Sequence, residues 1–168
     1  EALLALAAPL GLPVSMANSA GILAGIGTSC DWIRPGIMLY GASPYLDQAV
    51  SLRPVMSLTA PVIAIKSLRP GDTVGYGSRW QATEACNVAV LAIGYADGYP
   101  RQIQAGTSVW LNGQRETILG RLSMDMMTIS VSSKVLPLIG DRAQLWGKDL
   151  SIEEIARQAD SLSYVLMC

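Results

Sequence analysis

The sequence contains no histidine among its 168 residues. Catalysis by a Ser-His-Asp or Cys-His arrangement and zinc binding through imidazole are therefore excluded. Any proton transfer must use tyrosine, lysine, a carboxylate or a cofactor. Charge is also scarce, with a formal net charge of -1 and no basic stripe or tail. This argues against nucleic acid and anionic membranes as partners and favours small molecules or proteins.

Cysteine is rare as well. The three residues Cys30, Cys86 and Cys168 are odd in number and widely spaced, which predicts neither a disulfide framework nor a metal cluster. We expect no bound metal and a reducing, cytoplasmic setting.

Long apolar runs are also missing. Residues 2–30 carry no charge, but Pro9, Pro13 and Asn18 interrupt them. No stretch of about 18 to 20 apolar residues remains, so we expect no membrane span. The chain opens with Glu1 and not with Met, which is typical of an internal fragment of a longer protein.

The hydrophobic content of 51% is enough for one domain, or for a domain plus a fragment of another. Residues 2–10 have the alanine and leucine content of the end of a helix, stopped by Pro9 and Gly11. The stretch 12–22 predicts a short buried strand that runs into a loop carrying Asn18 and Ser19, as in a β/α unit.

From about Leu52 the pattern changes to short β-rich runs between regular turn signals, which predicts a sandwich or a barrel. Asn112–Gly113 is a strong hairpin signal because both residues tolerate positive φ. Near the end, Ser151 and Glu154 have the spacing of a capping box, followed by one apolar helix face.

Four segments set polar groups beside glycines at the end of an apolar run: "MANSAG" (16–21), "RPGIMLYG" (34–41), "GYADGYPR" (94–101) and "GRLSMDM" (120–126). Glycine frees backbone N–H groups and permits close approach to a ligand. Tyr95 is therefore either a packing residue at a strand end or a hydroxyl presented to a ligand. Each segment alone also fits an ordinary cap, turn or surface role.

Together and in this order, the segments resemble the C-terminal part of bacterial alanine racemases. The resemblance extends over "RPGIMLYGASP", "VMSLTAPVIAIKSLRPGDTVGYG", "IGYADGYPR", "GRLSMDM", "LWGK" and "YVLMC". It implies a mainly β chain: residues 1–44 would be the end of a pyridoxal-phosphate-binding (β/α)8 barrel, and residues 45–168 a C-terminal β-domain. About half of a full-length chain would be missing.

The resemblance also implies an activity. Such enzymes interconvert L-alanine and D-alanine through an aldimine with pyridoxal 5'-phosphate and supply D-alanine for the cell wall. They are homodimers whose active site is shared between subunits. Tyr95 matches one of the two bases and would reach the partner's site. The other base is a lysine whose motif Lys66, Lys134 and Lys148 do not match, so we expect this chain alone to be inactive.

The resemblance assigns the remaining site residues by position. Arg34 would face the pyridine nitrogen of the cofactor, and Ser19 would bind its phosphate together with the backbone N–H groups of Gly36 and Ile37. The amide of Met124 would hold the substrate carboxylate. Two supporting residues would lie near the entrance to the site, Arg121 and Asp125.

Two positions depart from the family. Ser15 stands where histidine is usual, and Val165 where glutamate is usual. Two other functions stay open at this point. One is a related pyridoxal-phosphate enzyme, such as a broad-specificity racemase or a decarboxylase. The other is a non-catalytic β-domain that binds a partner or ligand.

Overall fold

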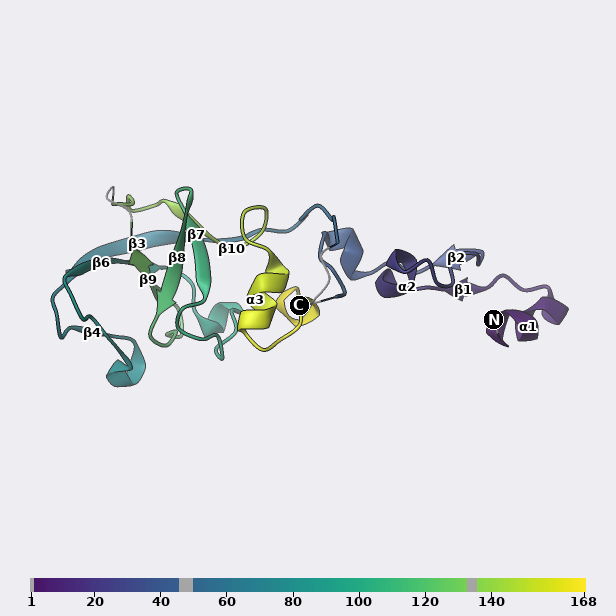
Figure 1. Cartoon of the computed structure of the whole chain (residues 1–168), viewed down its shortest axis with the longest axis horizontal. Helices are drawn as coiled ribbons and strands as arrows, with labels where there is room; N and C mark the ends of the chain where they lie inside the picture. The colour runs from purple at the N-terminus through teal and green to yellow at the C-terminus, as the bar shows by residue number, and fades with distance from the viewer. Residues whose placement is uncertain (1, 46–49, 133–135) are drawn as a thin grey trace. The chain divides into compact units, whose positions relative to one another are not determined.

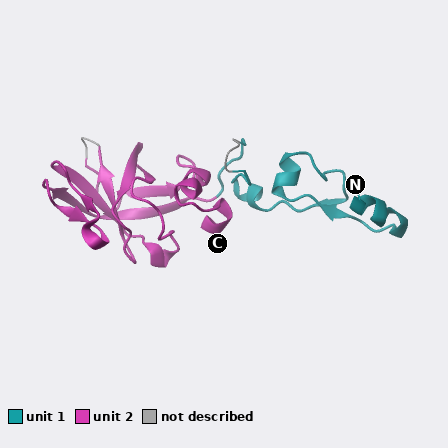
Figure 2. Ribbon diagram, turned by 60° about the horizontal axis from the view of Figure 1, so that its bottom comes forward, with its two compact units in different colours: residues 1–55 teal, residues 56–168 magenta. Residues whose placement is uncertain are grey.

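The computed structural model describes residues 2–45, 50–132 and 136–168. Lys134, considered above as a candidate cofactor lysine, lies outside these residues. The chain divides into two compact units, Glu1–Val55 and Met56–Cys168 (Figure 2). Within the described residues, no helix has both the length and the apolar character needed to cross a membrane.

The N-terminal unit begins with a helix that ends where the sequence predicts. Helix α1 (Ala2–Ala7) continues as the 3-10 turn η1 (Ala8–Leu10) and stops at Gly11, which has a φ of 60°. Left-handed backbone at this position suits glycine because it has no Cβ.

A small β/α/β element follows. Strand β1 (Ser15–Met16) leads into helix α2 (Ser19–Leu23) and then strand β2 (Trp32–Ile33), and the two strands pair in parallel. A parallel pair needs a crossover, which α2 provides. The 3-10 turn η2 (Ile37–Tyr40) comes next.

The β/α order predicted within residues 12–22 is observed, but the short strand is not buried. Ser15 is exposed in a strand of two residues, and the predicted loop ends at Asn18, which is the N-cap of α2, so that Ser19 is the first residue of that helix. The side chain of Asn18 caps that helix by accepting a hydrogen bond of 3.0 Å from the Gly21 N–H. The apolar pattern of the sequence could not predict this exposure, because exposure depends on the segments that pack against the strand. Little of the described chain covers it.

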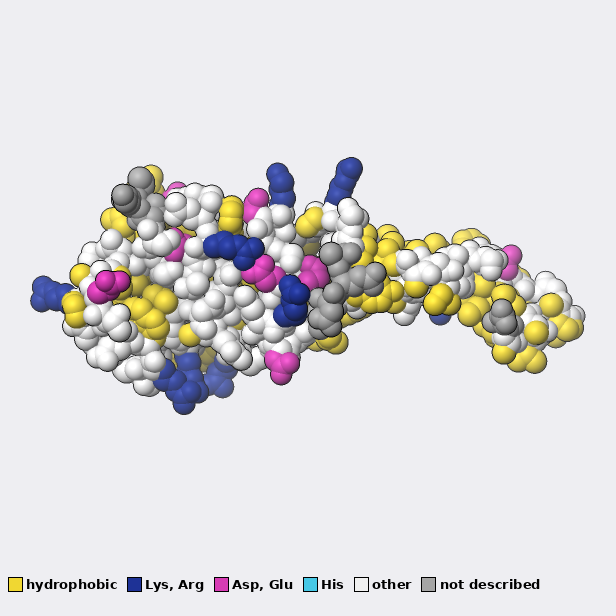
Figure 3. Space-filling view, viewed as in Figure 1, with side chains coloured by type: hydrophobic (Ala, Val, Ile, Leu, Met, Phe, Trp, Pro, Cys, Tyr) yellow, Lys and Arg dark blue, Asp and Glu magenta, His cyan; other side chains and the backbone are white. Residues whose placement is uncertain are grey.

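Hydrophobic side chains cover much of the surface of the N-terminal unit (Figure 3). Leu6 is 73% exposed, Leu10 68% and Trp32 67%. Contiguous apolar surface of this kind marks a face suited to contact with further protein.

The C-terminal unit is built on a closed barrel of six strands in the order β10-β3-β6-β9-β8-β7 (Figure 1). All strand pairs in it are antiparallel. The strands are β3 (Leu58–Leu68), β6 (Cys86–Leu91), β7 (Ser108–Leu111), β8 (Gln114–Leu119), β9 (Met127–Val131) and β10 (Arg142–Trp146). The prediction of a mainly β chain is confirmed. Of the two predicted architectures, the structure shows the barrel and not the sandwich. Strand β10, which closes the barrel, was not predicted individually from the sequence.

The barrel interior is filled by one face of each strand. Along β7 and most of β9, buried side chains alternate with partly exposed ones, as the two-residue period of a strand requires. Each of the six strands contributes at least one residue that is at most 1% exposed, among them Val62, Leu91, Val109, Ile118, Ile129 and Leu145.

Two local predictions are confirmed. Asn112 and Gly113 have φ values of 50° and 83° and join β7 to β8 in a two-residue hairpin. Helix α3 (Ile152–Gln158) starts at Ser151, whose hydroxyl accepts a hydrogen bond of 3.2 Å from the Glu154 N–H. Its buried face is Ile152, Ile155 and Ala156.

Shorter elements lie between and after the barrel strands. Strands β4 (Thr73–Val74) and β5 (Trp80–Gln81) form a two-stranded sheet around the 3-10 turn η3 (Tyr76–Ser78). The turn η4 (Tyr95–Asp97) follows β6, and helix α4 (Ser163–Leu166) lies near the C-terminus.

Helix α3 is joined to β8 by an ion pair between Arg115 and Glu154, with N–O distances of 2.5 and 3.0 Å. The guanidinium of Arg115 holds the pKa of the Glu154 carboxyl below its ordinary value of 4.5. A carboxylate with a lowered pKa in the folded state stabilises the protein above pH 4.5, and this stabilisation is lost as the pH falls through the lowered pKa.

We expect Glu154→Gln to reduce the free energy of unfolding by about 0.5 to 1 kcal/mol at pH 7, because the pair is partly exposed. The difference from wild type should shrink below pH 4.5 and disappear at lower pH. Urea denaturation across this pH range measures it, with Glu84→Gln at an exposed position as the control. A difference that persists at acid pH would show that the carboxylate charge is not what stabilises α3.

Candidate active site

The predicted site residues fall into one set in each unit. Ser19, Arg34, Gly36 and Ile37 belong to the N-terminal unit. The other four belong to the C-terminal unit: Tyr95, Arg121, Met124 and Asp125.

Ser19 is the first residue of α2, and only 1% of it is exposed. Its hydroxyl oxygen accepts hydrogen bonds from the backbone N–H groups of Gly36, at 2.9 Å, and of Met38, at 3.3 Å. The structure therefore brings Ser19 to Gly36 as predicted and adds Met38, which the sequence analysis missed. Ile37 lies between these two donors with its side chain buried.

Ser19 begins α2, whereas the two N–H groups belong to the start of η2 and both donate to the Ser19 hydroxyl, whose own O–H can donate to a phosphate oxygen. We call Ser19, Gly36 and Met38 the N–H cradle. An ideal Cβ at Gly36 would meet only the Ser19 hydroxyl, at 3.9 Å. The missing side chain thus leaves space beside the hydroxyl.

Arg34 lies just after β2 and is held by Ser15 in the paired strand. Its Nη1 donates to the Ser15 carbonyl oxygen at 2.6 Å and to the Ser15 hydroxyl at 2.9 Å. The backbone N–H of Arg34 also donates to the Ala17 carbonyl at 2.8 Å. The serine that departs from the family pattern is thus a partner of the arginine guanidinium.

Tyr95 begins the turn η4, which lies directly against the segment Ser123–Met124. The backbone N–H of Tyr95 donates to the Ser123 carbonyl at 3.2 Å, and that of Ala96 to the Met124 carbonyl at 2.8 Å. A Cβ at Gly94 would overlap both of these carbonyl oxygens. Only glycine allows this approach, which brings the predicted tyrosine next to the predicted substrate-binding methionine.

The ring of Tyr95 is partly buried, and the guanidinium carbon of Arg101 lies 5.3 Å from its centroid. This is the geometry of a cation–π contact. Asp97 closes the same turn by accepting a hydrogen bond of 2.8 Å from the Gly94 N–H.

A second tyrosine, Tyr76, lies in a similar turn that the sequence analysis did not single out. It stands between Gly75 and Gly77, with φ values of 78° and 72°, and is 62% exposed. A Cβ at Gly75 would lie 2.8 Å from the backbone nitrogen of Arg121. The Gly-Tyr-Gly sequence is the signal that could have identified Tyr76. A tyrosine between two glycines has no neighbouring side chains to cover its phenol, which is the property that singled out Tyr95.

The third tyrosine of this region, Tyr99, has a structural role. It is 1% exposed, and its ring stacks on Trp146 of β10, with a centroid distance of 5.9 Å and an interplanar angle of 13°. Burial raises the pKa of its phenol well above the ordinary value of 10. Tyr99 therefore anchors the loop after η4 to the barrel and is unsuited to proton transfer.

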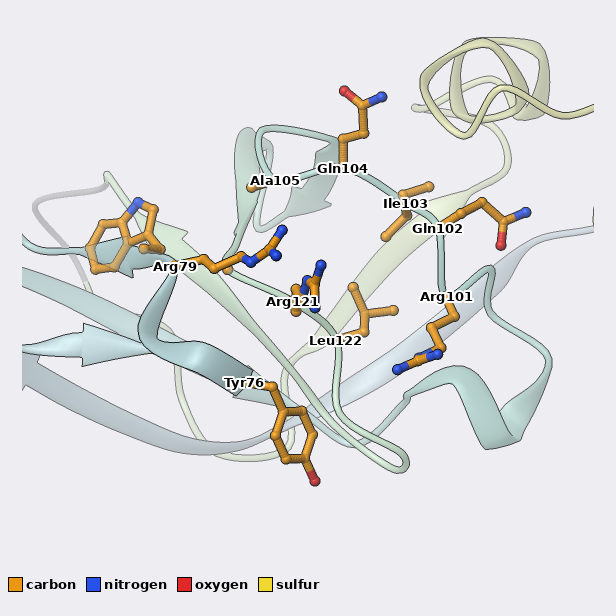
Figure 4. A pocket seen from close by; sticks show the side chains of 11 residues that line it. Tyr76, Arg79, Arg101, Gln102, Ile103, Gln104, Ala105, Arg121 and Leu122 are labelled. Carbon is orange, nitrogen blue, oxygen red and sulfur yellow. The ribbon is translucent and has the colours of Figure 1, made fainter.

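The remaining predicted residues lie at the surface. Met124 is 58% exposed, and Asp125 beside it is also exposed. Arg121 is exposed too and lines a cavity together with Tyr76 (Figure 4). Met124 and Asp125 are not among the residues that line this cavity.

Comparisons with known proteins identify the family of the chain. The family model "Alanine racemase, C-terminal domain" matches residues 55–168, and "Alanine racemase, N-terminal domain" matches residues 1–44. The chain belongs to the alanine racemase family. The expected domain boundary between residues 44 and 45, which separates the end of the (β/α)8 barrel from the β-domain, stays a prediction.

Two alanine racemases illustrate how close the family likeness is. The chain is 48% identical over 159 residues to the alanine racemase of Nitrosomonas eutropha, covering 93% of this chain and 44% of that protein. A biosynthetic alanine racemase from Pseudomonas aeruginosa superposes with a TM-score of 0.86 at 41% identity, covering 96% of this chain and 47% of that one. The chain thus spans less than half the length of these racemases.

A third relative bears on the cofactor. An alanine racemase structure from Bartonella henselae, described as having covalently bound pyridoxal phosphate, matches with a TM-score of 0.84 and 31% identity. The match covers 92% of this chain and 44% of that one.

Proposed function

We propose that this chain is the C-terminal part of a pyridoxal-phosphate-dependent alanine racemase, which interconverts L-alanine and D-alanine. The observation that carries the proposal is the N–H cradle with Arg34 close by in sequence, in a chain of this family. The cradle suits a phosphate, and the arginine suits the pyridine nitrogen, to which it can donate but not transfer a proton.

The residues present fit the cofactor. The backbone N–H groups of Gly36 and Met38 hold the Ser19 hydroxyl, whose own O–H can donate to a phosphate oxygen, and Ser15 fixes the guanidinium of Arg34. When bound, pyridoxal phosphate supplies the electron sink that makes the α-proton of an amino acid removable. The protein positions the groups and moves the protons.

The C-terminal unit would contribute a tyrosine as one of two proton carriers, since racemisation needs carriers on both faces of the α-carbon. The resemblance assigns this role to Tyr95. The geometry favours Tyr76 for the same role, because a carrier must reach a substrate bound elsewhere and its phenol is the more exposed. Tyr95, partly buried beneath Arg101 and tied to Met124, would then shape the substrate-carboxylate site.

The assembly is also part of the proposal. We infer a homodimer in which the proton-carrying tyrosine of one subunit serves the cofactor bound by the partner. Arg121 and Asp125 would lie near the entrance to that active site. The three cysteines are free thiols, which agrees with a reducing, cytoplasmic setting.

The direct test of the function is racemisation of L-alanine by the full-length protein with pyridoxal phosphate, followed by polarimetry or chiral chromatography. Appearance of D-alanine supports the proposal. Decarboxylation of an amino acid without racemisation would favour the related pyridoxal-phosphate enzyme instead.

A second test addresses the N–H cradle. We expect Ser19→Ala in the full-length protein to raise the dissociation constant for pyridoxal phosphate about tenfold, because one hydrogen bond to a charged group is lost. Titration of the apoenzyme followed by cofactor absorbance measures it. Ser29→Ala, at an exposed position of the same unit, is the control. Equal affinities in the two variants, with unchanged melting temperatures, would remove Ser19 from the phosphate site.

A further inference from the structure

The hairpin between β7 and β8 carries a chemically reactive pair of residues at its tip. Asn112 and Gly113 form the two-residue turn, and both are exposed to solvent. Because glycine has no Cβ, the backbone nitrogen of Gly113 is less shielded than that of a residue with a side chain. The side-chain carbon of Asn112 is therefore open to attack by the nitrogen that follows it in the chain.

This attack leads to deamidation, with water as the only other reactant. The Gly113 nitrogen bonds to Asn112 Cγ, the bond between Cγ and Nδ2 breaks, and ammonia leaves with the proton that the Gly113 nitrogen loses. Water then opens the five-membered ring at either carbonyl, which leaves aspartate or isoaspartate at position 112. The turn must open for the nitrogen to reach Cγ, and exposed loop tips open at low free energy.

The side chain of Asn112 is hydrogen-bonded to a carboxylate from a distant part of the chain. Its Nδ2 donates to Asp141 Oδ2 at 2.6 Å, and the same oxygen accepts a hydrogen bond of 2.9 Å from the Leu138 N–H. The hydrogen bonds from Asn112 and Leu138 hold the pKa of the Asp141 carboxyl below its ordinary value of 3.8. Asp141 is therefore charged at neutral pH.

The backbone that carries this carboxylate is anchored to β3. The Gly140 N–H donates to the Val62 carbonyl at 2.8 Å, and the Val62 N–H donates to the Asp141 carbonyl at 2.8 Å. A carboxylate formed at position 112 would thus face a second carboxylate that is held in place, and like charges at hydrogen-bond distance repel. Isoaspartate would also add one carbon to the backbone of the turn, which the geometry of a two-residue hairpin does not accommodate.

The contact lies on the seam that closes the barrel. In the ladder between β7 and β10, Trp110 is aligned with Gln144, and the hydrogen bond between Asn112 and Asp141 lies beyond this pair, at the hairpin tip. We propose that Asn112 is a site of spontaneous deamidation, and that the new carboxylate releases the hairpin tip from the turn before β10. Neither the N–H cradle nor the two tyrosine turns take part, so the inference does not depend on the proposed function.

The chemistry is tested by incubating the full-length protein in mildly alkaline buffer, followed by peptide mass spectrometry against an unincubated sample. We expect the peptide that contains Asn112 to gain the mass of an amide-to-acid exchange, with both aspartate and isoaspartate present. The internal controls are Asn18, which precedes the buried Ser19, and Asn87, which precedes the buried Val88; neither should react over the same time. No conversion at Asn112, or equal conversion at the three asparagines, would overturn the proposal.

Variants of the full-length protein test the consequence. Asn112→Asp should lower the urea midpoint of unfolding by roughly 0.3 M, the size of a weak surface interaction. Adding Asp141→Asn should restore most of this loss, because the new amide at 141 can donate to the new carboxylate at 112. Asn87→Asp is the matched control: its Oδ1 accepts a hydrogen bond of 2.8 Å from the Ser67 hydroxyl, which a carboxylate accepts equally well. An unchanged midpoint in Asn112→Asp, or no recovery in the double variant, would refute the release of the hairpin tip.

Discussion

Tyr76→Phe in the full-length enzyme should lower kcat for L-alanine by about 100- to 10,000-fold, the usual contribution of a positioned proton carrier. Tyr95→Phe should lower it by about tenfold or less. The reason is exposure: the Tyr76 phenol is 62% exposed between two glycines, whereas the Tyr95 ring is partly buried under Arg101. Steady-state kinetics and exchange of the α-proton with deuterated water measure the two effects.

The controls for this pair of variants are cofactor absorbance, which neither change should alter, and Tyr164→Phe at another partly exposed tyrosine. A larger loss in Tyr95→Phe would restore the assignment made by resemblance and leave Tyr76 as a residue of the cavity rim. If both variants retain full activity, the proposal of a tyrosine proton carrier fails.

Gly94→Ala should reduce the free energy of unfolding by about 3 kcal/mol or more, because two carbonyl oxygens leave no space for a Cβ and fixed backbone cannot move aside. Those oxygens belong to Ser123 and Met124. Urea denaturation followed by the fluorescence of buried Trp146 measures the loss.

The matched control is Gly98→Ala in the same turn. Gly98 has a φ of 89° but open space around it, so alanine should cost only about 1 kcal/mol for the left-handed backbone. Similar losses in the two variants would mean that η4 does not depend on its contact with the Ser123–Met124 segment.

Features determined by neighbouring residues could be predicted from the sequence. Asn112–Gly113 forms its hairpin because both residues accept positive φ, and Ser151 caps its helix because the donor lies three residues away. The mainly β character followed from many short apolar runs. In each case the physical cause lies within a few residues.

Features that depend on distant segments could not be predicted in the same way. Closure of the barrel needs β10 to pair with both β3 and β7, and the short run at 142–146 does not reveal its partners. The exposure of Ser15 could not be predicted either, because it depends on which other segments pack against strand β1. The contact between Ser19 and Gly36 joins two residues that the resemblance had named together, and Met38 is a further partner that it did not name. Binding of a phosphate by these residues stays a prediction.

The segment Gly120–Met124 supports both candidate tyrosine turns, through Gly75 at one end and Gly94 at the other. Changes to either turn are therefore mechanically linked, and their energetic effects should be non-additive even though Tyr76 and Tyr95 lie on different loops. A double-mutant cycle would measure this coupling. Attempts to engineer substrate breadth at residues 120–124 would alter both phenols together, which makes this segment a poor place for independent optimisation.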